Sequence, residues 1–280
     1  MSAEGQREGR YLVSKVRDIG DIEASINEAV EKIGGFNSYI NEGERVLIKP
    51  NYNSSDPPPA TSDPEFIAAL IRLLKKAGAA EVTVGESSMF LLSTRNVLSE
   101  TGLIDALERE DANVVVFNDS EWVKVDVGEN NLRDIKIPRV LNDFDSIVYS
   151  CCLKTHRLAG FSMSLKLGMG FTYPWTRIGW HLRGREEKIA EFNKILNPAL
   201  ILLDARKGFI RGGPFRGEVR EPGLVMASND RVAIDVEGIK IIQEYPGNSL
   251  RKNAWDYAQI KRSVELGLGS SSEKDYKVLV

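Results

Sequence analysis

Cysteine and histidine are both scarce in this sequence. Its 280 residues include only two cysteines, Cys151 and Cys152, and two histidines, His156 and His181. Neighbouring cysteines rarely pair with each other, so we expect no disulfide framework and a reducing compartment. Two thiols are too few for an iron–sulfur cluster, which usually takes four, and two imidazoles exclude a three-histidine zinc site. We therefore expect no iron–sulfur cluster.

Long hydrophobic runs are missing as well. The longest apolar stretches, such as Ala199–Leu203, are far shorter than the roughly 20 residues that a membrane-spanning helix needs. The N-terminus, MSAEGQREGR, is polar and lacks the apolar segment of a signal peptide. We expect a cytoplasmic protein with no membrane partner, and the sequence leaves a homodimer open.

The sequence does contain a regular alternation of strand-like and helix-like stretches, which favours one α/β domain over residues 1–280. We expect a Rossmann-like fold of three layers, in which helices cover both faces of a mostly parallel sheet. Two alternating stretches around Gly128–Asn131 predict an antiparallel hairpin over 120–138, which is either an insertion or an antiparallel edge of the sheet. Six short, β-branched and apolar stretches predict the buried strands: Tyr11–Val16, Arg45–Ile48, Glu81–Val84, Asn113–Phe117, Ser146–Ser150 and Ala199–Leu203.

The clearest predicted helix covers Asp63–Ala77. Ser62 and Glu65 have the spacing of a capping box, and Pro64 suits the first turn, where its missing N–H costs nothing. A second helix is predicted over Arg231–Gln243, where an acid in the first turn is favoured by the helix dipole.

Positive charge is concentrated in one region. Residues 151–220 contain 13 lysines and arginines against 5 acids, whereas the whole chain has a net charge of −3. This basic, glycine-rich block indicates an anion pocket on an acidic body, because a focused positive field attracts anionic ligands. The alternative is a solvated basic face.

Polar residues follow four of the predicted strands. In open parallel sheets the ligand crevice lies outside the carboxyl ends of the strands, so these side chains are expected to meet in one crevice. The cationic side chains in this set could bind an anion, and a pair of carboxylates could hold a metal ion or transfer a proton. The hydroxyl groups could orient a bound ligand. The residues are Lys49, Asn51, Glu86, Ser87, Ser88, Lys154, Thr155, His156 and Asp204.

The segment 154–170, KTHRLAGFSMSLKLGMG, is the richest of these stretches. Lys154 and His156 point the same way in an extended chain, and Lys166 follows near glycines that let a backbone approach an anion. Neither a Walker loop nor a dinucleotide-binding glycine motif is present. His156 is a candidate acid or base whose pKa Lys154 would lower; alternatively, it is a core histidine bonded to a backbone carbonyl.

A second glycine cluster follows Asp204. Gly212 and Gly213 lie before Arg216 and predict an arginine-flanked turn that covers the site. The alternative is a plain β-turn with no role in binding. Between the two clusters lies an aromatic loop, residues 171–180. The sequence does not decide whether it is a lid, a dimer contact or a membrane-touching surface.

These motifs together resemble the uncharacterised family known as domain of unknown function 362. The resemblance covers about residues 45–240 and implies an α/β fold and candidate site positions, but no reaction. Some family members carry a ferredoxin-like iron–sulfur module, which the cysteine-free tail 270–280 lacks, and Leu167 stands where the family more commonly has asparagine. The motifs are IKPN (48–51), SDP (62–64), GE (85–86), KTH (154–156), LK (165–166), MG (169–170), GGP with a later glycine (212–217) and AID (233–235).

The first functional hypothesis is an enzyme that acts on a small anionic metabolite bearing a phosphate or carboxylate. Lys49, Lys154 and Lys166 would bind the anion, and His156, Lys154, Lys166 and Glu86 are the candidate catalytic residues. Further ligand contacts are expected from Asn51, Ser87, Ser88, Thr155, Gly212, Gly213 and Arg216. A divalent cation, Mg²⁺ or Mn²⁺, would be held by Glu86, Asp204 and Asp235.

Two other hypotheses remain. The basic block 151–220 could bind nucleic acid, with Phe171, Tyr173 and Trp175 as stacking platforms. The acidic remainder and the absence of a nucleic-acid motif argue against this partner. The protein could instead be an accessory or redox-partner protein without its own cluster. The sequence does not assign a reaction class.

Overall fold

The structure is a computed structural model that describes residues 11–180 and 184–280. Its centre is a sheet with the strand order β12-β1-β11-β9-β7-β2-β3-β4, in which β10 pairs with β9 and β8 with β7. The run β9-β7-β2-β3-β4 is parallel, and β11 joins it antiparallel to both β9 and β1. The strands are β1 (Tyr11–Arg17), β2 (Arg45–Lys49), β3 (Glu81–Glu86), β4 (Asn113–Val116), β7 (Ser146–His156), β8 (Gly160–Phe161), β9 (Leu200–Gly212), β10 (Gly217–Arg220), β11 (Leu224–Ser228) and β12 (Tyr276–Leu279).

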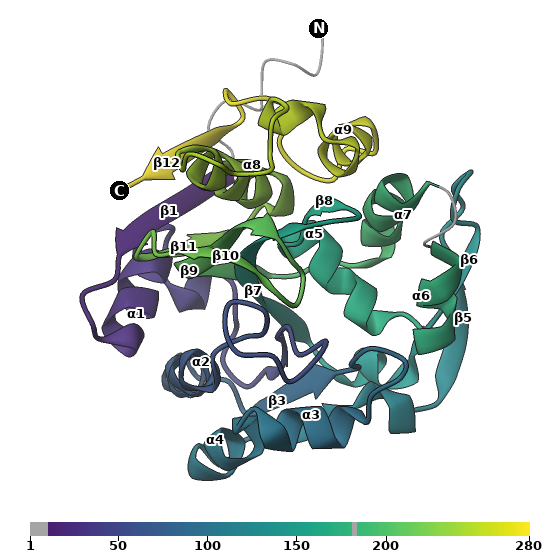
Figure 1. Cartoon of the computed structure of the whole chain (residues 1–280). Coiled ribbons are helices and arrows are strands. Elements are labelled where there is room, and N and C mark those ends of the chain that lie inside the picture. The colour runs from purple at the N-terminus through teal and green to yellow at the C-terminus, as the bar shows by residue number, and fades with distance from the viewer. Residues whose placement is uncertain (1–10, 181–183) are drawn as a thin grey trace, which may run out of the picture.

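Helices cover both faces of this sheet (Figure 1). Successive strand residues feed two separate cores: Val46 and Ile48 face the core beneath α1–α4, whereas Leu47 faces the core beneath α5, α7, α8 and α9. The predicted three-layer α/β fold is therefore confirmed. None of the helices in the described ranges has the length and apolar character that crossing a bilayer requires. The helices are α1 (Ile22–Lys32), α2 (Pro64–Lys76), α3 (Thr94–Glu100), α4 (Leu103–Arg109), α5 (Ser164–Leu167), α6 (Pro174–Trp180), α7 (Arg185–Phe192), α8 (Arg231–Gln243) and α9 (Ala258–Glu265).

Two central strands are longer than the sequence predicts. β7 continues to His156 and β9 to Gly212, because the two strands keep pairing as far as Lys154 and Phe209. Lys154 and His156 therefore lie within a strand instead of in the loop after it. Asp204 likewise lies inside β9.

The start of α2 is correct, but the predicted capping box is wrong. Asp63 is the N-cap, and its carboxylate accepts a hydrogen bond from the Glu65 N–H at 3.0 Å. The hydroxyl of Ser62 instead accepts from the Asn51 N–H at 3.0 Å, so it fixes the loop after β2.

The predicted hairpin forms a two-stranded antiparallel sheet of its own, β5 (Trp122–Asp126) and β6 (Asp134–Pro138). It is inserted between β4 and β7 and is not an edge of the main sheet. Its inner face packs on the core that α5 and α7 share, through Val127, Leu132 and Ile135.

Candidate functional site

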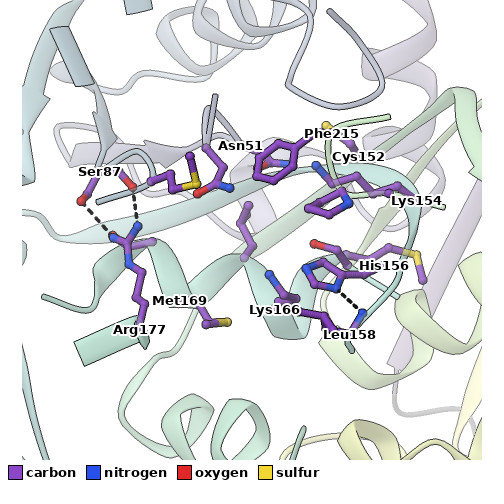
Figure 2. A pocket seen from close by; sticks show the side chains of 18 of the residues that line it. Asn51, Ser87, Cys152, Lys154, His156, Leu158, Lys166, Met169, Arg177 and Phe215 are labelled. Carbon is purple, nitrogen blue, oxygen red and sulfur yellow. Dashed lines mark hydrogen bonds between the residues drawn. The ribbon is translucent and has the colours of Figure 1, made fainter. Parts of the chain in front are cut away.

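A cavity of about 720 Å³ opens at the carboxyl ends of β2 and β3 and along the end of β7 (Figure 2). Helices α5 and α6 and the turn between β9 and β10 close its other sides. In the described part of the chain, six lining residues are lysine or arginine and one is an acid. The predicted residues that the structure brings together here are Lys49, Asn51, Glu86, Ser87, Lys154, His156, Lys166, Gly213 and Arg216.

A buried ion pair lies in the wall formed by β2 and β3. The Lys49 Nζ donates to Glu86 Oε1 at 2.7 Å and to the Pro50 carbonyl at 2.5 Å. Glu86 also accepts from the backbone N–H groups of Ser87 and Tyr52, each at 2.7 Å. Burial lowers the pKa of Lys49, and the adjacent Glu86 carboxylate opposes that change. The pair thus joins the loops after the two strands and leaves little net charge.

Alternate residues of β7 face the cavity. Cys152, Lys154 and His156 line it, as the extended-chain argument predicts. The Lys154 Nζ donates to the Ala60 carbonyl at 2.5 Å, and burial lowers the pKa of this amine. Cys151 points to the opposite face of the strand, so the two free thiols are directed apart.

The ring of His156 is held by backbone N–H groups of the turn that follows it. Its Nδ1 accepts hydrogen bonds from the backbone N–H groups of Leu158 at 3.1 Å and Ala159 at 3.2 Å. A neutral imidazole with Nδ1 as acceptor carries its proton on Nε2. The side chain lines the cavity while its Nδ1 is held by its own turn, and both the acid-or-base interpretation and the core-histidine interpretation stay predictions.

The short helix α5 carries Lys166 and is fixed at its start by a buried carboxylate. Asp235 of α8 accepts from the N–H of Ser164 at 2.8 Å and from the N–H of Leu165 at 3.0 Å. Such contacts satisfy donors that a helix start leaves unpaired. Asp235 therefore supports the residue before Lys166 and does not reach the cavity.

Lys166 itself is half-buried in the cavity wall. Its Nζ forms no hydrogen bond or ion pair with any residue in the described ranges. Burial lowers the pKa of Lys166 to about 7, and the positive charges of Lys154, Arg177 and Arg185 act in the same direction.

Arg177 of α6 lines the cavity but has no motif around it, and sequence reasoning missed it. Its guanidinium donates to Ser87 (carbonyl 2.9 Å, Oγ 2.9 Å), to the Ser88 carbonyl at 3.0 Å, and to the carbonyls of Gly170 and Thr172, each at 3.0 Å. Burial lowers its pKa to about 10. Because its donors are already used, Arg177 ties the loop after β3 to the start of α6.

The turn between β9 and β10 covers the cavity and requires glycine. Gly213 has φ of +68°, and a Cβ added there would lie 2.0 Å from the Thr155 carbonyl oxygen. This close approach places Phe215 and Arg216 on the cavity rim. Arg157 also lines the cavity, and the predictions from the sequence do not include it. Its place directly after the KTH motif is the feature of the sequence that could have identified it.

Three predicted ligand residues lie outside the cavity lining. The Ser88 hydroxyl donates to the Tyr52 carbonyl at 2.7 Å. Thr155 is fully buried on the other face of β7, and its hydroxyl donates to the Gly212 carbonyl at 3.4 Å. Gly212 itself lines a neighbouring, smaller cavity. These three residues shape the walls and do not face a ligand in the main cavity.

The three carboxylates predicted to share a divalent cation do not meet. Asp204 pairs with Arg206 at 2.7 Å, Asp235 anchors α5, and Glu86 pairs with Lys49. No cluster of three or more histidine, cysteine or acidic side chains that could hold a metal occurs in residues 11–180 and 184–280. The shared cation site is therefore a wrong prediction, because each carboxylate is taken by a different partner.

The predicted aromatic stacking surface does not form either. Phe171 is fully buried and packs on Phe117, with ring centroids 5.4 Å apart. Tyr173 packs edge-on against Trp122 at 5.1 Å. Of the three predicted platforms only Trp175 is exposed, and Arg177 is the residue of the loop 171–180 that lines the cavity.

Comparisons with known proteins find a similar curated protein and several similar solved structures. The thylakoid-associated protein sll1697 of Synechocystis sp. is 29% identical over 243 residues, covering 84% of this chain and 74% of that protein. A crystal structure from Thermotoga maritima has a TM-score of 0.49 at 16% identity and covers 79% of this chain and 57% of that one. The lactate racemase apoprotein of Thermoanaerobacterium thermosaccharolyticum has a TM-score of 0.44 at 16% identity, with 75% and 53% covered.

This chain thus spans little more than half the length of those two structures. The family comparison covers the residues that build the cavity, from β2 through α8. Residues 46–240 match the family described as Domain of unknown function (DUF362), and this chain belongs to that family.

Proposed function

We propose that the cavity binds a small anionic metabolite, bearing a phosphate or carboxylate, and that the protein acts on it as an enzyme. The observation that carries this proposal is the charge of the lining: six cationic side chains surround the cavity, and the acid, Glu86, is already paired with Lys49. An anion would enter a positive field and find donors whose charge the protein leaves uncompensated.

Arg157 and Arg216 are the groups best placed to capture the anion. Both are exposed at the rim, and neither forms an ion pair with a residue in the described ranges. Arginine stays charged at all physiological pH values and can bind a phosphate or carboxylate with two parallel hydrogen bonds. Lys154 would meet the ligand deeper in the cavity, and His156 would move the proton.

The test measures the Kd of inorganic phosphate, pyrophosphate and citrate by calorimetry, with and without Mg²⁺, for the natural chain and for Arg157→Gln/Arg216→Gln. We expect binding that the double substitution weakens at least about tenfold, because the rim loses two charges. The control Arg17→Gln/Arg133→Gln removes the same charge from exposed positions outside the cavity and should leave the Kd unchanged. Absence of binding by all three anions, or an equal loss in the control, contradicts the proposal.

The effect of Mg²⁺ in this experiment tests the predicted divalent cation. Since Glu86, Asp204 and Asp235 do not meet, a cation would have to be held by the ligand together with one of them. A Kd that falls on addition of Mg²⁺ supports that arrangement.

The cytoplasmic location also stays a prediction, and the similar Synechocystis protein is named for its association with thylakoids.

A further inference from the structure

Lys166 differs from Lys49, Lys154 and Arg177, the other cations below the rim of the cavity, in having no hydrogen-bond or ion-pair partner in the described ranges. Lys49 is paired with Glu86, Lys154 donates to the Ala60 carbonyl, and Arg177 donates to a set of backbone oxygens. Within the described ranges the Nζ of Lys166 has no hydrogen-bond acceptor. Figure 2 shows its amine in the cavity together with His156 and Phe215.

The surroundings of this amine favour its uncharged form. Apolar side chains line the cavity beside it, including Met163, Leu167 and Met169. Burial and the neighbouring cations lower its pKa to about 7, so the neutral amine is much more populated at neutral pH than in an ordinary lysine. An uncharged amine has the lone pair that nucleophilic attack requires, and both a desolvated pocket and an adjacent cation are known means of activating lysine.

We propose that Lys166 is a nucleophilic lysine that forms an imine with an aldehyde or ketone group of the anionic ligand. The inference rests on the proposed function, since the rim arginines hold the anionic group while the amine meets the carbonyl. It narrows the substrate class to small anionic carbonyl compounds, such as 2-oxo acids or phosphorylated aldehydes.

The step balances within the site. The Nζ lone pair attacks the carbonyl carbon, a C–N bond forms, and the C=O electron pair moves to oxygen, which takes up a proton. The nitrogen then loses a proton, and the C–O bond breaks as the hydroxyl leaves with a second proton as water. The product is the protonated imine. The Nε2–H of the neutral His156 imidazole would donate a hydrogen bond to the carbonyl oxygen as it gains negative charge, and the protons taken up and released in the step are exchanged with solvent water.

The backbone next to Lys166 is held in place, which limits the positions that its amine can reach. Asp235 holds the first two N–H groups of α5, and the Asn193 side-chain amide donates to the Leu165 carbonyl at 2.8 Å. The residue that carries the amine is therefore held from α8 and from the end of α7. A reactive group on a rigid element meets its target in a narrow range of geometries.

Reductive trapping tests the proposal. The full chain is incubated with glyoxylate, pyruvate, 2-oxoglutarate or pyridoxal 5′-phosphate and reduced with sodium cyanoborohydride, and the modified lysine is located by peptide mass mapping. We expect a stoichiometric adduct on Lys166 with at least one probe, its loss in Lys166→Arg, and no change in Lys277→Arg, an exposed lysine of β12. Absence of a Lys166 adduct with all four probes overturns the proposal, as does an equal adduct in Lys166→Arg.

A second measurement reports on the amine alone. At pH 7 the arylating anion trinitrobenzenesulfonate should modify Lys166 at least about tenfold faster than Lys277, because an ordinary lysine is almost wholly protonated there. Equal rates overturn the imine proposal even if phosphate binds, and then the proposed function stands without it. If phosphate, pyrophosphate and citrate all fail to bind, the proposed function fails instead.

Discussion

At the scale of single residues, the cavity shows which side chains the protein satisfies and which it leaves for a ligand. Lys49 and Glu86 are both nearly inaccessible, at 1% and 2% exposure, and they satisfy each other. A buried pair of this kind is costly to break, because the remaining charge has no partner. Lys166 lowers the stability of the folded protein for a different reason, because its charged amine lies among apolar groups and other cations.

Replacing Lys166 should therefore stabilise the protein in a pH-dependent manner. Folding lowers the pKa of Lys166. As the pH falls from about 10 to about 7, the amine is therefore protonated in the unfolded chain before it is protonated in the folded chain. The free energy of unfolding of the natural protein decreases over that range. We expect Lys166→Met to raise the free energy of unfolding by about 1–2 kcal/mol at pH 6.5 and by much less at pH 10.

Urea denaturation at the two pH values measures this difference. Lys277→Met on the exposed edge strand is the control, and it should leave the free energy of unfolding unchanged at both. A gain for Lys166→Met that is the same at pH 6.5 and pH 10 contradicts the account of the amine given above.

The sequence alone predicts many of these residues, for a physical reason. Lys154 and His156 were placed on one side of the chain because side chains alternate in any extended segment, and that argument needs no tertiary structure. Arg177 could not be found in this way. Its role depends on backbone carbonyls that come together only once α6 packs against the loop after β3.

At the scale of secondary-structure elements, α5 shows how a short helix is held in place. It has four residues, too few for a helix that is stable by itself. Its starting N–H groups are bound by Asp235 from α8, a residue that the sequence placed in the first turn of that helix. The predicted metal ligand is therefore a support for α5.

Asp235→Asn should weaken both the fold and the site. An amide offers one acceptor oxygen and turns its NH₂ group toward the second N–H, so one buried donor loses its partner, which costs about 1–3 kcal/mol. We expect a lower free energy of unfolding in urea and slower arylation of Lys166 by trinitrobenzenesulfonate. Asp119→Asn on the exposed surface is the control. Unchanged stability and arylation would refute a supporting role for Asp235.

The boundaries of β7 and β9 were the part of the elements that the sequence could not predict. Lys154 to His156 and Arg206 to Gly208 are polar or flexible, which in isolation favours a loop. Lys154 stays extended because it pairs with Phe209 of β9, and Thr155 and His156 because they pair with β8. Gly208 pairs with Leu153, and the Arg206 side chain binds Asp204 and Asp63. Long-range pairing therefore overrides the local preference.

At the scale of the whole molecule, the two ends of the described chain meet in one sheet. β1 lies between β11 and β12, so the first strand is held by strands from the last quarter of the chain. The cavity likewise draws on β2 and β3 from the first half and on β7, α5 and the β9–β10 turn from the second. One domain over residues 1–280 stays a prediction.

Calorimetric unfolding tests that prediction. A single cooperative unit should give one transition whose van't Hoff and calorimetric enthalpies agree. Pyrophosphate at a concentration of about 100 Kd should shift that whole transition upward, since binding to the folded state adds about 2.7 kcal/mol of stability. Two transitions, of which one moves with pyrophosphate, would show that the chain divides into separate units.

The depth at which each charge lies sets how the cavity responds to its surroundings. Arg157 and Arg216 stand in water at the rim, whereas Lys49 and Glu86 are enclosed. Dissolved ions screen the first pair beyond a Debye length of about 8 Å at physiological ionic strength, and they hardly reach the second. Rising salt should therefore slow the arrival of an anion while the interior that receives it keeps its shape.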